Sequence, residues 1–442
     1  MSALARYFKA GGFDVAGYDR VESELTSQLL AEGNIIHFTD AVDIIPEIYR
    51  DIDKREEVLV VYTPAVPEIH QELAFFREKG FRVVKRSEVL GWITQEAKSI
   101  AVAGTHGKTT VSTMIAHLLK QSELDCSAFL GGISRNYNTN FLSGKSDLVV
   151  LEADEYDRSF LQLYPWMAVV TAMDADHLDV YGKKEEMEKS FVKFIGQIKP
   201  GGILLIKKGL QLESENLHDV SVYTYGVFEN ADFYSYDVTI KEGLYVFNVH
   251  TPVGIIKEIH FGCPGRMNVE NAVAAVATLT LLGVKQETIK KALLHFTGVK
   301  RRFEIVVKTD KLVYIDDYAH HPEELKACIA SVREMFPGKS ITGVFQPHLY
   351  SRTQEFANEF AGSLDKLDEL ILLDIYPARE KPVPGVTSEM ILREMKMKNK
   401  QMAKKENLTD LLENKELEVL LTLGAGDIDE YVEPLKEMLE KR

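Results

Sequence analysis

The sequence contains little of what marks several classes of protein. It has only three cysteines, Cys126, Cys263 and Cys328, and no C-x-x-C spacing. An odd, scattered set of cysteines argues against a disulfide framework and against a zinc site. No hydrophobic run approaches the roughly 20 residues that cross a membrane. We therefore expect a cytoplasmic protein with no membrane partner.

Positive charge is also scarce. The 52 lysines and arginines are outnumbered by 67 aspartates and glutamates, which gives a formal charge of −15 at pH 7. Nucleic-acid-binding proteins normally present a basic face, so we expect no nucleic-acid partner. The richest basic run, residues 393–405, also contains three methionines and is interpreted as the solvated face of a helix. At 442 residues, the chain should form two or three domains.

One stretch combines a strand, a glycine loop and a helix. Residues 100–103 are apolar and predict a buried strand, and the loop after them contains Gly104 and Gly107. The next apolar residues recur at helical spacing: Val111, Met114, Ile115, Leu118 and Leu119. Glycines let the backbone approach a ligand, and the N–H groups at a helix start face an anion. The pattern predicts a phosphate-binding loop, in which Lys108 reaches the outer phosphates and the Thr109 hydroxyl ligates Mg²⁺.

This loop departs from the general phosphate-loop pattern at one place. The general pattern has a glycine five residues before Gly107, where this sequence has Val102. The alternative is a Gly-Lys turn that binds no phosphate. The strand before the loop and the helix after it favour phosphate binding, but the loop alone does not identify the reaction.

Acidic residues follow the next two predicted strands. Residues 148–151 run into an acidic segment that begins at Glu152, and residues 167–171 run into a segment with three aspartates and His177. The carboxyl ends of parallel strands lie at one edge of a sheet, so both segments should face the phosphate loop. Carboxylate oxygens and an occasional imidazole suit Mg²⁺. Glu152 and His177 are therefore the candidate ligands, and solvated loops are the alternative.

The segments on either side of this region also show an α/β pattern. Residues 1–95 alternate a helix at 4–9 with strands at 13–19, 35–38, 58–62 and 81–84, which predicts a parallel, doubly wound sheet. Asp19 ends the first of these strands, where such folds place a carboxylate near a ribose. Short alternating segments over 220–262, such as 220–225 and 244–249, predict antiparallel hairpins. A helix predicted over 269–282 carries Asn271 in its first turn.

The C-terminal part has four predicted strands that each end in polar residues. The strands are 312–315, 341–345, 370–373 and 419–423, and the segments after them carry His, Arg, Tyr and Asp. Four such ends on one sheet predict a polar rim of the kind that borders an active site. The basic segment 300–304 precedes them at a domain junction, where an arginine can close on a nucleotide.

Seven motifs, in this order and spacing, resemble the Mur ligase family over nearly the whole chain. They are Gly-Thr-His-Gly-Lys-Thr-Thr (104–110), Glu-Ala-Asp-Glu (152–155), Asp-His-Leu-Asp (176–179), Gly-Val-Lys-Arg-Arg-Phe-Glu (298–304), Asp-Asp-Tyr-Ala-His-His-Pro (316–322), Gln-Pro-His-Leu-Tyr-Ser-Arg-Thr (346–353) and Gly-Ala-Gly-Asp-Ile (424–428). The resemblance implies an α/β protein of three domains. These are a Rossmann-like UDP-sugar domain (1–95), a P-loop ATPase domain with a mainly parallel sheet plus antiparallel hairpins (96–298), and a Rossmann-like C-terminal domain (299–442).

The resemblance is strongest to the branch of the family that joins L-alanine to UDP-N-acetylmuramate, with ATP and Mg²⁺ as cofactors. It implies a cytoplasmic enzyme of peptidoglycan precursor synthesis that acts as a monomer or homodimer. The implied nucleotide-binding residues are Gly104, Thr105, His106, Gly107, Lys108, Thr109, Thr110, Asn271, Arg302 and Asp317. The implied metal ligands are Thr109, Glu152 and His177, and the implied catalytic residues are Lys108, His320, His348 and Arg352.

Two departures from the family pattern bear on the site. Met267 stands where relatives commonly have a histidine before the adenine-binding asparagine, so Asn271 and apolar contacts should recognise adenine. No lysine follows His177 at the spacing of the carbamylated lysine of later-acting relatives, as expected for the alanine-adding branch. The alternatives are a recycling ligase that attaches a tripeptide to the same sugar, a folate-type polyglutamate ligase, and a nucleotide-binding protein without chemistry.

The start of the chain carries a further expectation. In the family a strand and a glycine loop precede a Met-Ser pair, and this sequence begins at Met1-Ser2. Such a loop would supply N–H groups to the UDP pyrophosphate. We expect on this basis that a longer native protein exists and that the 442-residue chain binds ATP but binds the UDP-sugar poorly.

Overall fold

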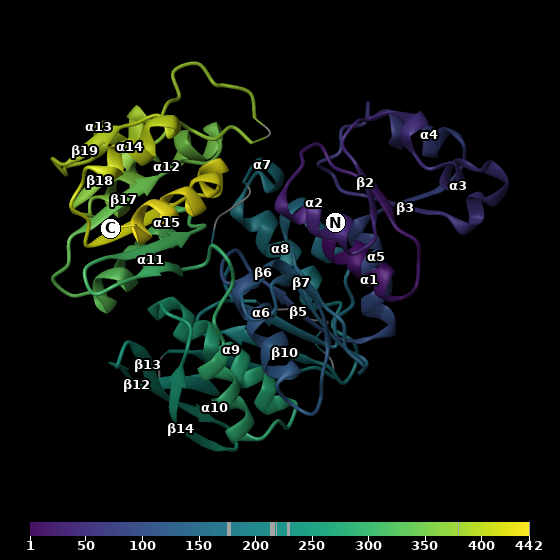
Figure 1. Ribbon diagram of the computed structural model, residues 1–442. Coiled ribbons are helices and arrows are strands. Elements are labelled where there is room, and N and C mark those ends of the chain that lie inside the picture. Colours follow the sequence, from purple (N-terminus) through teal and green to yellow (C-terminus); the bar gives the residue numbers. More distant parts are fainter. Residues whose placement is uncertain (175–177, 213–216, 218, 228–229, 379, 442) are drawn as a thin grey trace. The chain divides into compact units, whose positions relative to one another are not determined.

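The computed structural model describes the chain except for residues 175–177, 213–216, 218, 228–229, 379 and 442. It divides into two compact units (Figure 1). The first comprises residues 1–234, 250–254 and 273–292, and the second comprises residues 235–249, 255–272 and 293–442. Among the described residues, no helix is long and apolar enough to span a membrane.

The N-terminal part of the first unit has two small sheets. Its elements are α1 (Ser2–Ala10), β1 (Ala16–Tyr18), α2 (Glu24–Ala31), β2 (Ile35–His37), α3 (Glu47–Arg50), β3 (Leu59–Tyr62), α4 (Gln71–Glu78), β4 (Arg82–Lys85) and α5 (Arg86–Glu96). β1 pairs with β2 and β3 pairs with β4, both in parallel. The parallel α/β pattern is therefore confirmed, but the described strands form two separate two-stranded sheets rather than one sheet. The apolar pattern identifies strands, but it does not specify which strands pair.

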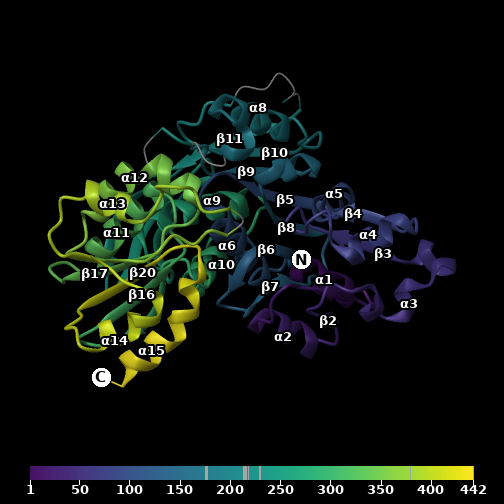
Figure 2. The same cartoon turned by 90° about the horizontal axis from the view of Figure 1, so that it is seen from above.

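Arg6 fastens α1 to the rest of the first unit. Its guanidinium is nearly buried and donates hydrogen bonds to Glu32 at 2.8–3.0 Å and to Gln28 at 3.2 Å, both near the end of α2. A further N–H donates to Asn140 Oδ1 at 2.7 Å, and the Asn140 amide donates to Ser2 Oγ at 2.8 Å. Asn140 belongs to β7 (Thr139–Leu142), so α1 lies against the edge of the central sheet (Figure 2).

A ten-stranded sheet forms the centre of the chain. Its strand order is β14-β13-β12-β11-β10-β9-β5-β8-β6-β7. The bounds are β5 (Lys98–Ala103), β6 (Ser127–Ser134), β7, β8 (Leu148–Ala153), β9 (Met167–Val170), β10 (Ile203–Lys207), β11 (Ser221–Gly226), β12 (Phe233–Lys241), β13 (Leu244–Thr251) and β14 (Gly254–Phe261). The pairs from β6 through β12 are parallel, and β7 is antiparallel to β6.

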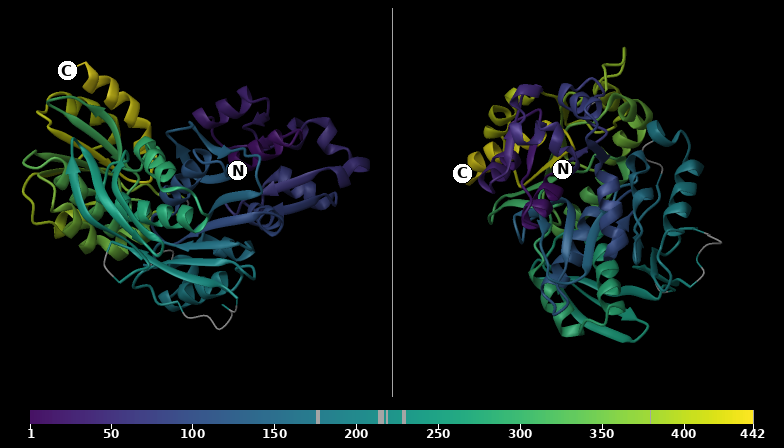
Figure 3. Two further views of the ribbon diagram at one scale, coloured as in Figure 1. Left: turned by 90° about the horizontal axis from the view of Figure 1, so that it is seen from below. Right: turned by 90° about the vertical axis from the view of Figure 1, so that its right-hand side faces the viewer.

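The predicted antiparallel hairpins occupy one end of this sheet. β12, β13 and β14 follow one another through two-residue links, which makes antiparallel hairpins (teal in Figure 3). The expectation was wrong for residues 220–225, because β11 runs parallel to both β10 and β12. Burial in β11 changes along the strand, from exposed Ser221 and Val222 to buried Tyr225 and Gly226.

Helices cover both faces of the parallel part of the sheet. On one face, side chains of β5, β8 and β9 share a core with α5 and α8 (Lys184–Ile195). Ile100 and Val102 alternate to the other face, where α6 (Lys108–Lys120) packs. α7 (Leu178–Tyr181), α9 (Arg266–Leu281) and α10 (Gln286–His295) complete the helices of this region. With residues 100–103 fully buried, the loop after β5 is held at a fixed place on the sheet edge.

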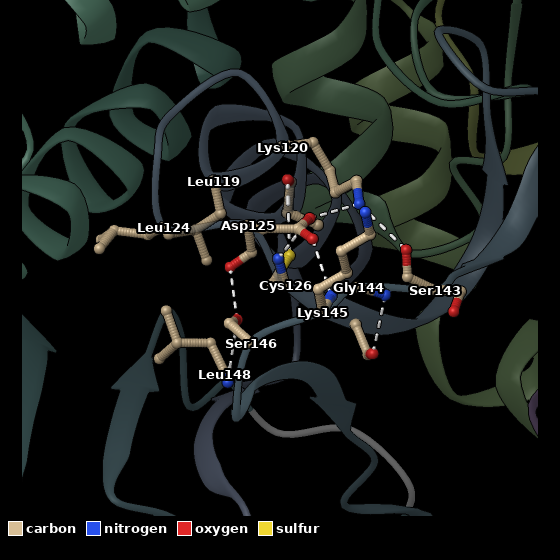
Figure 4. Close-up of polar contacts among 12 residues, drawn as sticks. Leu119, Lys120, Leu124, Asp125, Cys126, Ser143, Gly144, Lys145, Ser146 and Leu148 are labelled. Atoms are coloured by element: carbon tan, nitrogen blue, oxygen red, sulfur yellow. Dashed lines mark hydrogen bonds and ion pairs between the residues drawn. The ribbon is translucent and has the colours of Figure 1, made fainter.

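A network around Asp125 fixes the far end of α6 (Figure 4). The Lys120 ammonium pairs with the Asp125 carboxylate and donates to the Ser143 carbonyl at 3.0 Å. The same carboxylate accepts the N–H groups of Cys126 and Lys145, each at 2.8 Å. These contacts hold the Asp125 pKa below its ordinary value, although burial alone would raise it. The helix that begins at the glycine loop is thus tied at its other end to the segment before β8.

The second unit contains a six-stranded sheet of order β15-β16-β20-β17-β18-β19, parallel except for β15. Its strands are β15 (Glu304–Lys308), β16 (Val313–Asp317), β17 (Ile341–Phe345), β18 (Glu369–Leu372), β19 (Lys400–Met402) and β20 (Val419–Leu423). Its helices are α11 (Pro322–Met335), α12 (Tyr350–Leu364), α13 (Glu389–Glu394), α14 (Leu408–Glu413) and α15 (Val432–Glu440). Separate apolar cores on the two faces place α11, α12 and α13 on one side and α14 and α15 on the other.

The basic run at 393–405 was expected to be a helix, and this expectation was wrong. α13 ends at Glu394, and Lys400–Met402 forms the edge strand β19. The Lys400 ammonium donates to the carbonyls of Leu392 and Met395, which satisfies the free end of α13.

Candidate active site

The loop between β5 and α6 has the backbone of a phosphate cradle. Gly104 and Gly107 adopt φ values of +136° and +82°, which other residues rarely adopt. Gly107 is the residue before the first turn of α6, so the first N–H groups of the helix face the space above the loop. A Cβ on Gly104 would lie 2.3 Å from Thr171 Oγ1 and 2.7 Å from the Ala172 nitrogen. The loop therefore requires glycine for both conformation and space.

The end of β9 supports this loop. Thr171 Oγ1 donates to the carbonyl of His106, and the Thr105 N–H donates to the Ala172 carbonyl at 3.1 Å. Thr105 Oγ1 accepts the N–H of Asp174 at 3.0 Å, and His106 Nε2 lies 3.3 Å from the Asp174 carboxylate. Loop and strand end thus form one unit. Predicted residue Thr110 is buried in the first turn of α6, and His177 lies outside the described residues.

Lys108 extends back over the loop that it follows. Its ammonium donates to the Gly104 carbonyl at 2.7 Å and to Glu155 Oε1 at 2.8 Å. Burial acts to lower the Lys108 pKa, but the carboxylates of Glu155, Glu152 and Asp154 outweigh it and raise the pKa. The lysine is therefore a cation at neutral pH although its side chain is only 13% exposed.

Thr109 and Glu152 form an oxygen pair beside the loop. Thr109 Oγ1 donates to Glu152 Oε2 at 2.7 Å. Gly131 on β6 leaves the space that the carboxylate occupies, because a Cβ there would lie 2.1 Å from Glu152 Oε2. A hydroxyl and a carboxylate at the edge of a phosphate cradle are the donors that Mg²⁺ takes, so the residues present fit this ion.

The second unit brings all four of its predicted strand ends together through ring and hydrogen-bond contacts. The His320 and His348 rings lie 5.7 Å apart, and the His348 ring stacks at 5.8 Å on Tyr376. Gln346 Nε2 donates to Asp427 Oδ1 at 2.7 Å, and its Oε1 accepts the N–H of Ile428. The chain after β16, β17 and β20, together with Tyr376, makes a continuous polar rim.

Leu349, between His348 and α12, has a strained backbone. Its φ is +70°, a value that a branched residue rarely adopts, and its side chain is 5% exposed. Its N–H donates to the Tyr376 carbonyl at 3.0 Å, and the Tyr376 N–H donates to Pro347 at 2.8 Å. These bonds hold the turn that presents His348, and the buried predicted residue Arg352 follows in the first turn of α12.

Asp317 and Arg302 lie at the end of β16. Asp317 Oδ2 accepts the Phe303 N–H at 2.6 Å, and Oδ1 accepts the Ala319 N–H at 2.7 Å. The Arg302 guanidinium lies 4.9 Å from the centre of the Tyr318 ring. The carboxylate therefore already organises the basic segment 300–304, a role that the sequence motif does not reveal.

The pKa of Asp317 supplies a testable pH effect. Burial raises this pKa to about 6 from an ordinary value near 3.8, although Arg302 and two N–H groups oppose the change. A folded-state pKa above the unfolded value means that the contribution to stability is full below pH 3.8 and is lost as pH rises through 6. The free energy of unfolding of the unaltered protein, relative to that of Asp317→Asn, should therefore fall by up to about 3 kcal/mol between pH 4 and pH 7. A pH-independent difference between the two proteins in urea titrations would contradict this.

Asn271 lies in the first half of α9, where its amide donates to Asn268 Oδ1 at 3.1 Å. Asn268 in turn donates to the Pro264 carbonyl at 2.6 Å. Met267 packs on the core of the C-terminal sheet, and its sulfur accepts a hydrogen bond from Ser331. The Met267 side chain thus contributes to the packing of the second unit.

A cavity of about 300 Å³ lies in the first unit, and part of its lining comes from the segment that follows Glu155. Its lining residues are Lys85, Ser87, Glu88, Asp157, Arg158, Ser159 and Gln162. Asp157 and Arg158 both have positive φ, at 53° and 56°, and consecutive strained residues are typical of functional sites. The two cations of the lining are balanced by the carboxylates of Glu88 and Asp157, and the Lys85 ammonium lies 3.7 Å from Asp157 Oδ2, so the lining is polar but does not favour an anion.

Sequence reasoning gave no role to Glu155 or Gly131. Glu155 lies three residues after Glu152 in the same acidic segment. This short spacing was the one feature of the sequence that could have pointed to a role for Glu155 beside the loop. Gly131 lies in a strand, where an isolated glycine often marks the close approach of another group. Only the structure shows that this group is the Glu152 carboxylate.

Known proteins match this chain along its whole length. The profile "Mur ligase family, catalytic domain" matches residues 1–98, "Mur ligase middle domain" matches 102–279, and "Mur ligase, glutamate ligase domain" matches 301–426. UDP-N-acetylmuramate–L-alanine ligase of Parabacteroides distasonis is 52% identical over 443 residues, which cover 100% of this chain and 95% of the relative. The enzyme of the same name from Porphyromonas gingivalis strain W83 is also 52% identical, with 100% and 96% covered.

Solved structures show the same relationship. The crystal structure of UDP-N-acetylmuramate-alanine ligase from Thermotoga maritima has a TM-score of 0.83 at 26% identity and covers 100% of this chain and 96% of that one. A murein peptide ligase from Psychrobacter arcticus shares the fold, with a TM-score of 0.68 at 20% identity over 100% of this chain and 97% of that one. From the three profile matches and the identity to the curated relatives, the chain belongs to the Mur ligase family.

Proposed function

We propose that this protein is the ATP-dependent ligase that joins L-alanine to the lactyl carboxylate of UDP-N-acetylmuramate in the cytoplasm. The observation that carries the proposal is the full-length identity of about half to relatives that bear this name. The phosphate cradle with its paired Thr109 and Glu152 supports it independently. Residues 1–95 would hold the UDP-sugar, residues 96–298 ATP, and residues 299–442 the amino acid.

The reaction solves a chemical problem, because a carboxylate is a poor electrophile. A carboxylate oxygen attacks the γ-phosphorus of ATP, the bond to the β–γ bridging oxygen breaks, and ADP leaves. The L-alanine amine then attacks the acyl carbon of the resulting acyl phosphate. The tetrahedral intermediate expels inorganic phosphate, the nitrogen loses a proton, and an amide is formed. Catalysis of this kind depends on positioning and on neutralising phosphate charge.

The glycine loop would serve the first step. The N–H groups of Gly104 through Thr110, with Thr105 and His106 fixed by the end of β9, would surround the phosphates. Lys108 would contact the outer phosphates. Thr109 and Glu152 would hold one Mg²⁺, and His177 would help to hold a second; bound Mg²⁺ neutralises phosphate charge.

The C-terminal unit would serve the second step. His320, His348 and Arg352 are the groups proposed for the amino-acid carboxylate and the developing charge. Asn271 would contact adenine, Arg302 the phosphates and Asp317 the ribose.

The proposal predicts substrate-dependent phosphate release. With ATP, Mg²⁺ and UDP-N-acetylmuramate, L-alanine should accelerate phosphate release at least tenfold over glutamate or the L-Ala-γ-D-Glu-diaminopimelate tripeptide. Mass spectrometry should show the amide product. Acceleration by the tripeptide alone would establish the recycling ligase instead, and acceleration by glutamate on a folate substrate would establish the polyglutamate ligase.

A further inference from the structure

Glu155 is a buried carboxylate to which the proposed reaction gives no role. Its side chain is 0% exposed, and its Oε1 accepts a hydrogen bond from Lys108 Nζ at 2.8 Å. A carboxylate removed from water in this way is costly unless it is paired. A buried pair whose cation belongs to the phosphate loop therefore suggests a function beyond packing.

The number of donors on Lys108 indicates what that function is. An ammonium group has three N–H donors. One is used by the Gly104 carbonyl and one by Glu155, and no third acceptor lies in the described part of the chain. Two fixed acceptors therefore define the position of the nitrogen and leave one N–H for a ligand in the cradle.

The carboxylate is itself held in place. Glu155 lies two residues after the end of β8 at Ala153. Its backbone carbonyl accepts a hydrogen bond from the hydroxyl of Tyr181, a residue that is 4% exposed, at 2.6 Å. The anchor for Lys108 is thus built on the sheet and on α7, rather than on the glycine loop.

We propose that Glu155 is a positioning residue, which fixes the Lys108 ammonium so that its remaining N–H meets a nucleotide phosphate. Glu155 itself does not touch the nucleotide. The inference rests on the proposed function only in that the loop binds a nucleotide. The proposal adds a residue that acts through Lys108. It also divides the acidic segment into two roles, in which Glu152 binds the metal and Glu155 positions the lysine.

The test is a double-mutant cycle. Calorimetry measures the affinity of the full chain and its variants for ADP in the presence of Mg²⁺. Glu155→Gln keeps the size of the side chain and removes its charge. Alone it should weaken ADP binding about tenfold, which is about 1.4 kcal/mol. In a Lys108→Met background it should not weaken binding further, because the group through which it acts is gone. Glu123→Gln, at an exposed position, is the matched control.

Two results would overturn the proposal: unchanged ADP affinity in Glu155→Gln, or an equal loss in both backgrounds, which would show general support of the loop. If Glu155→Gln does not fold, Glu155→Asp provides the same comparison, because it keeps the charge but withdraws it from Lys108. Amide formation is not measured, so a different ligase specificity leaves the test intact. Failure of the unaltered chain to bind ADP or ATP would contradict the proposed function instead.

Discussion

Replacing Lys108 with alanine should lower kcat for L-alanine-dependent phosphate release by about a hundredfold or more. The ammonium is a mostly buried cation that is held in place beside the glycine loop, where charge would develop on the transferred phosphoryl group. Fixed cations at such a place are among the larger contributions to catalysis. Steady-state rates at saturating ATP, UDP-N-acetylmuramate and L-alanine would measure the effect.

The structure adds a control that the motif alone does not provide. Lys108→Ala leaves the buried Glu155 carboxylate without its cation, which should also destabilise the fold. Lys108→Ala combined with Glu155→Gln removes both charges and should recover much of the lost thermal stability without recovering the rate. A folded Lys108→Ala protein with near wild-type phosphate release would refute the assignment of Lys108.

The second large effect concerns the metal. Glu152→Gln keeps the hydrogen-bonding shape of the side chain but removes the negative charge that a divalent cation requires. The Mg²⁺ concentration for half-maximal turnover should rise about tenfold or more, because the ligand to the ion is weakened. Titrations of Mg²⁺ at saturating substrates would measure this shift, with Glu123→Gln as the exposed control.

Gly131→Ala provides an independent version of the same experiment. The added methyl would overlap Glu152 Oε2 and displace the carboxylate from Thr109, so the Mg²⁺ requirement should rise although both ligands are intact. If activity falls in both variants with an unchanged Mg²⁺ requirement, then Glu152 does not bind the metal. The acidic segment would then serve the nucleotide or the sugar.

The sequence predicted those features that depend on neighbouring residues. The α/β class, the central parallel sheet with hairpins and the Mur ligase resemblance are confirmed by the structure and by the relatives. The glycine loop was predictable because a strand, two glycines and a helix follow one another within 20 residues. The polar ends of the C-terminal strands were predictable because parallel strands place their carboxyl ends at one edge.

Features that depend on distant contacts were not predictable in this way. Apolar patterns at 13–38 and 58–84 indicated strands, but not their pairing as two separate sheets. The alternation at 220–225 could not distinguish a strand with two parallel neighbours from a strand of an antiparallel hairpin. Asp317 provides a third case, since its bond to the Phe303 N–H spans 14 residues and follows from the way that β16 meets the basic segment.

The positive φ of Leu349 limits which side chains its position can carry. Its positive φ costs on the order of 1–3 kcal/mol. The burial of its side chain returns on the order of 1.5–3 kcal/mol. Glycine would relieve the backbone but forfeit the burial, whereas alanine would keep the strain and lose most of the apolar contact. The strain and the burial are therefore of similar size, so glycine should change stability little at this position, whereas alanine should destabilise the turn that presents His348.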